Sequence, residues 1–198
     1  MQKIILASNN EHKVKEVKRI LCDYEIVTLN DIGFTEEIEE TGVTFEENAT
    51  LKARTVRQFL VENDMELIPV MADDSGLCCT ALNGEPGIYS ARYSGNGNKA
   101  NRDKLIANLL NKEDKSAYFN CTISIVYPDC TCDVVEGRTY GKIIDKELGD
   151  TSFGYDSIFY STELNKTFGQ ASAEEKDSVS HRGRALEKVK TILQSKNI

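Results

Sequence analysis

Apolar residues recur along the chain with two periods, one typical of β-strands and the other of α-helices. Runs such as KIILA and LIPVMA are almost continuously apolar, as in strands buried on both faces. Elsewhere the apolar residues line one helical face, for example Val14, Val17 and Leu21. The pattern predicts strands over 3–7, 24–29, 67–72, 119–127, 132–144 and 156–160, and helices over 11–22, 44–62, 99–110 and 180–193.

The order of these segments predicts the fold class. Strands mix with helices toward both ends, and residues 119–127 and 132–144 alternate in polarity like the two strands of a hairpin. This order favours an α/β protein with a central mixed sheet flanked by helices over a doubly wound parallel sheet. No repeat, low-complexity tract or linker interrupts the chain, so residues 1–198 are expected to form a single domain.

Composition and charge narrow the class of partner. Of the 198 residues, 40% are hydrophobic and 28% are charged, as in ordinary globular proteins. The net charge of −8 argues against a nucleic-acid or anionic-membrane surface, since both need clustered lysine and arginine. The stretch MQKIILASNN has too short an apolar run for a signal peptide or a membrane span, so a cytoplasmic location is expected.

The cysteines do not form a recognisable framework. Six cysteines and two histidines are present, and no CxxC pair occurs. This spacing favours neither a set of disulfides nor a zinc site. We expect reduced cysteines that act as small apolar residues, and Cys130 and Cys132 are the pair in which redox or metal chemistry would first be sought.

Two adjacent carboxylates, Asp73 and Asp74, follow the apolar run that ends at Ala72. Successive side chains of a strand face opposite ways, so one carboxylate is expected to face a ligand and the other to satisfy the backbone of a turn. Mg²⁺ favours one or two carboxylates together with phosphate oxygens and water. One of the two aspartates with Glu39 or Glu40 would meet that demand, and the division within each pair stays open.

Two predicted helices begin with basic side chains. His12 and Lys13 lie in the first turn of one, and His181, Arg182 and Arg184 lie in the first turn of the other. Cations at a helix N-terminus oppose the helix dipole, and an anion bound at the same place would explain them. The alternative, that these side chains extend into solvent, is about equally supported by the sequence.

Lys52 follows Asn48 by four residues, which places both on the helical stripe opposite the apolar face. Taken alone, this spacing is typical of a solvated surface lysine.

The common nucleotide-binding and hydrolase motifs are missing. GNGNKA does not satisfy GxGxxG, and neither GxxxxGK[ST], a Gly-x-Ser-x-Gly elbow nor HExxH occurs. The turn SFGYDSIF carries aromatic side chains that could stack on a base or pack in the core.

Taken together, several stretches resemble the inosine triphosphate pyrophosphatase family, the ITPase-like enzymes that act on non-standard purine nucleoside triphosphates. The matching stretches, in order, are ILASNNEHK, EETGVTFEENATLKA, ADDSGLCCTALNGEPGIYSARYSG, SFGYDSIF and EEKDSVSHRGRAL. The resemblance implies an elongated central mixed sheet, two lobes around a substrate cleft and a homodimer. It also implies Mg²⁺-dependent hydrolysis of ITP, dITP and XTP to the monophosphate and pyrophosphate.

The resemblance also implies roles for particular residues. Asp74 would accept the proton of the attacking water, and Glu39 and Asp74 would bind the metal. The substrate-binding residues would be Ser8, Asn9, Asn10, Glu11, His12, Lys13, Lys52, Ser75, Phe153, Gly154, Tyr155, Asp156, Lys176, His181 and Arg182.

The chain departs from the family pattern at two places. Ser8-Asn9-Asn10 stands where Thr-Gly-Asn is common, and Ser157 stands where Pro is common. Serine keeps the hydroxyl, and asparagine can adopt the left-handed conformation of glycine, so the loop is expected to survive. A pyrophosphatase for modified pyrimidine nucleotides and a non-catalytic nucleotide sensor are the alternatives.

Overall fold

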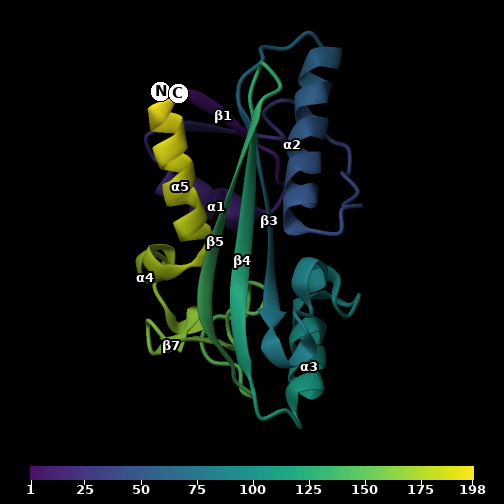
Figure 1. The fold of residues 1–198 in the computed structure, drawn as a ribbon, viewed down its shortest axis with the longest axis vertical. Helices are drawn as coiled ribbons and strands as arrows, with labels where there is room; N and C mark the ends of the chain where they lie inside the picture. Colours follow the sequence, from purple (N-terminus) through teal and green to yellow (C-terminus); the bar gives the residue numbers. More distant parts are fainter. The chain divides into compact units, whose positions relative to one another are not determined.

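A computed structural model describes all 198 residues, Met1–Ile198. Seven strands form one sheet in the order β2-β1-β3-β4-β5-β6-β7 (Figure 1). β1 pairs in parallel with β2 and β3, whereas β5–β6 and β6–β7 pair antiparallel, which confirms the predicted mixed sheet. The strands are β1 (Lys3–Leu6), β2 (Glu25–Thr28), β3 (Val70–Cys79), β4 (Ser116–Val126), β5 (Cys132–Ile143), β6 (Phe159–Ser161) and β7 (Lys166–Thr167).

Five α-helices and three short 3₁₀ segments connect the strands. The α-helices are α1 (Glu11–Ile20), α2 (Phe45–Glu62), α3 (Gly97–Leu109), α4 (Ala173–Val179) and α5 (His181–Ser195). The 3₁₀ segments are η1 (Thr80–Leu82), η2 (Gly87–Arg92) and η3 (Phe168–Gln170). No helix is both long enough and apolar enough to span a membrane.

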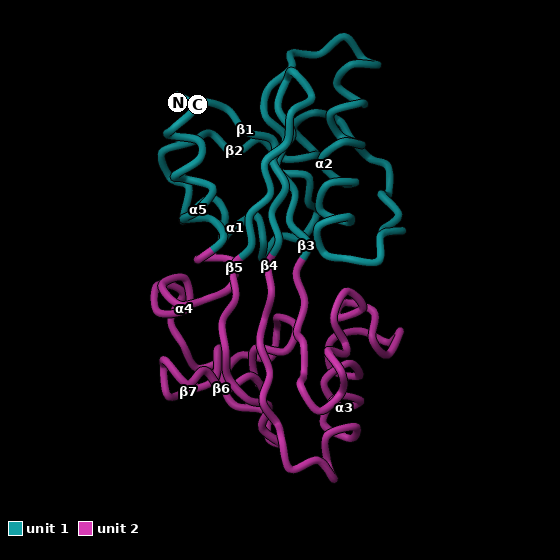
Figure 2. Tube along the Cα trace, in the orientation of Figure 1, with its two compact units in different colours: residues 1–74, 122–136, 185–198 teal, residues 75–121, 137–184 magenta.

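The chain divides into two compact units (Figure 2). Unit 1 comprises Met1–Asp74, Thr122–Glu136 and Ala185–Ile198, and unit 2 comprises Ser75–Cys121 and Gly137–Arg184. β3, β4 and β5 each run from one unit into the other. In β3, the boundary between the units falls between Asp74 and Ser75.

In unit 1, helices cover both faces of the strands, with α2 on one side and α1 and α5 on the other (Figure 2). Ala53 and Val56 of α2 pack on Ile5, Val70 and neighbouring apolar residues of the sheet. The two chain ends meet here, because the Gln2 side chain donates to the Asn197 carbonyl at 2.8 Å. The apolar face predicted for residues 44–62 is therefore the face that α2 buries.

The core of unit 2 is built around aromatic side chains. Phe119 and Phe159 have ring centroids 4.7 Å apart, and Phe168 lies 5.0 Å from Phe159. Leu105 and Leu109 of α3 join the same buried cluster. This core anchors the segment SFGYDSIF, because Tyr155 and Ile158 are among its members.

Local side chains fix where the first two helices begin. Asn10 caps α1, and its side chain accepts from the backbone N–H groups of His12 and Lys13 at 3.0 and 3.3 Å. Thr44 caps α2 by accepting from the Glu47 N–H at 3.1 Å, as the capping pattern of the sequence predicted.

The prediction that a strand ends at Ala72 was wrong. β3 continues to Cys79, so Asp73 and Asp74 lie in mid-strand and no turn follows them. Carboxylates are poor strand formers when exposed, yet here each side chain is buried beside a lysine on its own face of the sheet. α4 and the short strand β7 were not predicted, because each is too brief to show a hydrophobic period.

Candidate active site

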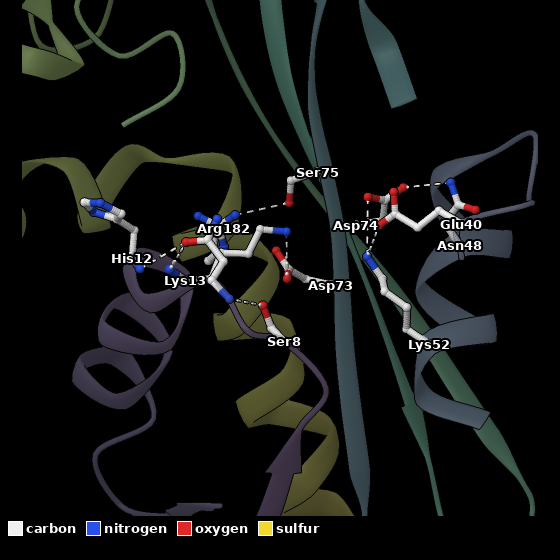
Figure 3. A network of polar contacts seen from close by, with 11 residues as sticks. Ser8, His12, Lys13, Glu40, Asn48, Lys52, Asp73, Asp74, Ser75 and Arg182 are labelled. Atoms are coloured by element: carbon white, nitrogen blue, oxygen red, sulfur yellow. Dashed lines mark hydrogen bonds and ion pairs between the residues drawn. The ribbon is translucent and has the colours of Figure 1, made fainter. Parts of the chain in front are cut away.

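Asp73 and Asp74 lie side by side in β3 and point to opposite faces of the sheet (Figure 3). Both carboxylates are buried, with 2% and 5% of the residue exposed. The sequence-based prediction that the two aspartates face different ways is thus confirmed. Each carboxylate therefore has its own set of partners.

On one face, Asp73 pairs with Lys13 of α1. The Lys13 Nζ lies 3.1 Å from the Asp73 Oδ1. The loop before α1 is held in place by its own side chains, since Ser8 Oγ accepts from the Asn10 N–H at 3.2 Å. Lys13 at the start of a helix is thus explained in part by a buried carboxylate that stabilises its charge.

On the other face, Asp74 meets two side chains of α2. The Lys52 Nζ lies 3.6 Å from Asp74 Oδ1 and 2.7 Å from Glu40 Oε1. The Asn48 amide donates from Nδ2 to Asp74 Oδ2 at 3.2 Å. The interpretation of Lys52 as a solvated surface lysine was therefore wrong: its side chain is only 12% exposed, because its ammonium lies between the carboxylates of Asp74 and Glu40 and not in water.

Asn48 is a contributor that sequence reasoning missed. It is fully buried, and its Oδ1 accepts from the Gly42 N–H at 2.8 Å while its Nδ2 binds Asp74. These two bonds fix the orientation of the amide. A Cβ at Gly42 would lie 2.7 Å from Asn48 Oδ1, so the acidic loop approaches α2 this closely only with glycine. The i, i+4 spacing of Asn48 and Lys52 was the available signal.

The burial and the charges around Lys52 and Asp74 shift the pKa values of both side chains. Burial raises the pKa of the Asp74 carboxyl, the Lys52 ammonium lowers it, and the Glu40 carboxylate raises it again, so that the pKa lies above its ordinary value. Burial lowers the pKa of Lys52, but Asp74, Asp73 and Glu40 together raise it above its ordinary value. Lys52 is therefore held protonated by carboxylates that repel one another.

A second set of polar side chains lies in unit 2. Arg182 is buried and donates from Nη2 to Ser75 Oγ at 3.3 Å. His181, also buried, stacks on Phe119 with ring centroids 4.7 Å apart and planes 13° from parallel. The basic start of α5 is thus directed into the protein, which rules out the alternative that His181 and Arg182 extend into solvent.

Lys176 and Asp156 form a buried ion pair in the same unit, 2.6 Å apart. The Lys176 ammonium also lies 4.8 Å from the centre of the Phe153 ring. Tyr155 turns away from this pair and donates its hydroxyl to the Ser90 carbonyl at 2.8 Å. Gly154 takes a φ of +48°, which glycine adopts without strain.

The structure thus brings together most of the residues singled out from the sequence, within one unit or the other. Asn9, Asn10, Glu11 and His12 are exposed around the start of α1. Glu39 is also exposed. It forms no ion pair with Lys52, whose glutamate partner is Glu40. All six cysteines are free thiols, as expected.

The carboxylates of unit 1 fit an Mg²⁺ ion of the kind that a nucleotide brings with it. No three or more His, Cys, Asp and Glu side chains in the chain are arranged as a complete metal site. Mg²⁺ on a polyphosphate does not need one, because one or two carboxylates suffice. Asp74 and Glu40 fit this demand, since the Glu40 carboxylate raises the pKa of Asp74 and a cation beside the two would offset that repulsion.

The chain is similar to known proteins over nearly its whole length. The Ham1 family profile matches residues 4–192. A dITP/XTP pyrophosphatase of Clostridium perfringens is 48% identical over 200 residues, which cover 98% of each chain, and one of Campylobacter jejuni is 45% identical over 198 residues, again 98% of each.

Solved structures agree with these relatives. The Staphylococcus aureus Ham1 protein superimposes with a TM-score of 0.86 at 42% identity, and a HAM1 protein from Coxiella burnetii with 0.87 at 34%. In both cases 98% of this chain and 100% of the other are covered. The resemblance inferred from the sequence motifs is confirmed: the chain belongs to the Ham1 family.

Proposed function

We propose that this protein hydrolyses non-standard purine nucleoside triphosphates, namely ITP, dITP and XTP, to the monophosphate and pyrophosphate. The observation that carries the proposal is the pair of opposed, buried carboxylates Asp73 and Asp74, each with its own lysine. That arrangement lies in a chain that matches curated dITP/XTP pyrophosphatases over nearly its whole length. Removal of these nucleotides from the nucleotide pool is the role we infer.

Asp74 is the proposed proton acceptor for the water that attacks the α-phosphorus. A general base must be ionised, and Lys52 at 3.6 Å favours the ionised form. Asn48 holds the carboxylate in one orientation through its amide N–H. An Asp with a raised pKa is also a stronger base than an ordinary carboxylate.

Lys13, Lys52 and the loop from Ser8 are the proposed binders of the triphosphate. The first turn of α1 presents the positive end of the helix dipole to an anion, while the Asn10 side chain accepts from the N–H groups of His12 and Lys13. Asp74 with Glu40 or Glu39 would hold Mg²⁺, which supplies positive charge to the phosphate oxygens. Glu40 is the better placed of the two glutamates, since it already shares Lys52 with Asp74.

The residues of unit 2 are proposed to select the base. Phe153 to Asp156, with Lys176, His181 and Arg182, would contact the purine, and Ser75 would contact the substrate close to Asp74. Donors aimed at a 6-oxo group bind inosine or xanthine, whereas the 6-amino group of adenine cannot accept from them. ATP would leave buried donors unpaired, and this unfavourable state is the proposed source of discrimination.

Pyrophosphate release from a panel of nucleotides tests the proposal. We expect kcat/KM for ITP, dITP and XTP to exceed that for ATP and dUTP by about 10²-fold or more. Lys99→Met is a suitable control variant, because Lys99 is exposed and pairs only with Asp103 one helical turn away. Binding without pyrophosphate release would indicate a sensor, and a preference for dUTP would indicate a pyrimidine enzyme.

Removal of divalent metal is expected to abolish turnover. Dialysis against EDTA should stop pyrophosphate release from ITP, and excess Mg²⁺ should restore it, because the carboxylates of Asp74 and Glu40 repel a polyphosphate unless a metal cation offsets their charge. The thermal unfolding midpoint of the stripped protein should remain near that of the untreated protein. Full activity after metal removal would refute the Mg²⁺ requirement.

The homodimer stays a prediction drawn from the resemblance, and the cytoplasmic location stays one drawn from the short apolar run in MQKIILASNN. Light scattering of the purified protein measures the first.

A further inference from the structure

α3 carries a buried arginine, Arg102, that belongs to none of the residue sets described above. Only 4% of its side chain is exposed. Its Nε donates to Glu147 Oε1 at 2.6 Å, and its Nη1 donates to the carbonyls of Thr151 and Gly154 at 3.2 and 2.8 Å. These three hydrogen-bond partners lie in one segment, residues 147–154, which overlaps the start of Phe153–Asp156.

Burying a guanidinium is unfavourable unless its donors are satisfied. Two of the bonds of Arg102 go to backbone carbonyls three positions apart in the chain, and both come from the same nitrogen. The two N–H bonds of this nitrogen lie in the guanidinium plane, which the Nε bond to Glu147 orients, so their directions are fixed. The N–H bonds of an ammonium group rotate about its carbon–nitrogen bond and set no such directions. Arg102 thus sets the shape of the turn between Thr151 and Gly154 together with the Asp150 carboxylate, which accepts from the Ser152 N–H and hydroxyl at 2.8 Å.

The other side of this turn is attached to the core of unit 2. The Asp150 N–H donates to the Gly169 carbonyl at 2.7 Å, and the Gly169 N–H donates to the Asp156 carbonyl at 2.9 Å. These two bonds fix the ends of the turn, whereas Arg102 fixes its middle. Without Arg102, the two ends of the turn would stay anchored, and Phe153 and Gly154 between those ends would become more mobile.

The neighbouring residue of α3 supports the same assembly. Asn101 is buried and donates to the Ser90 carbonyl at 3.3 Å, the same oxygen to which the Tyr155 hydroxyl donates at 2.8 Å. Two consecutive buried polar residues of α3 therefore hold the segment that contains Phe153–Asp156, Arg102 directly and Asn101 through Ser90.

We propose that Arg102 is a positioning residue for base selection: it fixes the turn that presents Phe153–Asp156 to the purine, and so determines how strongly the enzyme prefers a 6-oxo base. The inference rests on the proposed function of that segment. It assigns no contact between Arg102 and the nucleotide. Its effect is transmitted through the carbonyls of Thr151 and Gly154.

Three variants separate this role from a general contribution to stability. Arg102→Lys keeps the charge and loses the fork, Glu147→Gln removes the charge of the partner and leaves both carbonyl bonds, and Lys99→Met is the control on the same helix. For each, kcat and KM are measured with ITP and with ATP, and the dissociation constants of both nucleotides are measured by calorimetry. Thermal unfolding establishes that each variant is folded at the assay temperature.

For Arg102→Lys, we expect KM for ITP to rise by about tenfold with kcat changed by less than about threefold, and the preference for ITP over ATP to fall by about tenfold. Glu147→Gln and Lys99→Met should keep the preference within about threefold of wild type. An unchanged preference in Arg102→Lys, or a loss of kcat that is equal for both nucleotides, would overturn the inference. If wild type releases no pyrophosphate from ITP, the proposed function fails, and the ratio of the two dissociation constants still decides the role of Arg102.

Discussion

Asp74→Asn is expected to lower kcat for ITP by about 10³-fold while leaving the protein folded. The amide cannot accept a proton from water, yet its Oδ1 can still accept from Asn48 Nδ2, so the packing of the site is kept. Because the pKa of Asp74 is raised, its charged form is disfavoured by folding. Removing that charge should leave the free energy of unfolding at neutral pH within about 1 kcal/mol of wild type, or above it.

The matched comparison is Asp73→Asn, the same substitution at the next residue of the strand. Asp73 faces Lys13 on the opposite side of the sheet, so its loss should weaken the hold on Lys13 and lower kcat by about tenfold or less. Initial rates of pyrophosphate release at saturating ITP measure both effects. Equal losses in the two variants would show that the assignment of the base to Asp74 is wrong.

Lys52→Met is expected to lower the free energy of unfolding by about 3 kcal/mol, the largest stability effect that we predict in the site. The pKa of Lys52 is raised despite its burial, which means that folding favours its charge. Its removal would leave the buried carboxylate of Asp74 beside the half-buried carboxylate of Glu40 with no cation between them. Urea unfolding followed by circular dichroism measures the change, and Lys99→Met should stay within about 0.5 kcal/mol of wild type.

A double-mutant cycle sharpens the Lys52 prediction. If the destabilisation comes from an uncompensated carboxylate, Asp74→Asn should recover part of the stability that Lys52→Met removes. Additive effects of the two substitutions would instead mean that Lys52 acts through the packing of its aliphatic stem. The cycle thus distinguishes charge from volume in a residue that sequence alone placed on the surface.

Much of the fold could be predicted from hydrophobic period and capping, because those signals are local. α2 is an example: Thr44 marks its start, and the spacing of Ala53, Val56 and Leu60 marks its buried face. The mixed sheet followed from the order of strands and helices. These predictions need no knowledge of what lies far away in the chain.

The environment of the carboxylates could not be predicted in the same way. An aspartate pair in mid-strand is unfavourable by local propensity, and only partners from distant segments make it stable. Lys13 reaches Asp73 from α1, and Lys52 reaches Asp74 from α2, on a helical stripe that the sequence pattern assigned to solvent. The family motifs still identified these residues, which shows that the motifs record tertiary contacts that periodicity does not.

The interleaving of the two units has a consequence for how this enzyme can change over evolution. Unit 1 is assembled from three stretches of chain and unit 2 from two, and three strands pass from one to the other. Neither unit corresponds to a continuous stretch that recombination could exchange as a module. We therefore expect a new base preference to arise by substitution in place, in turns such as the one that Arg102 is proposed to position, and not by exchange of a whole unit.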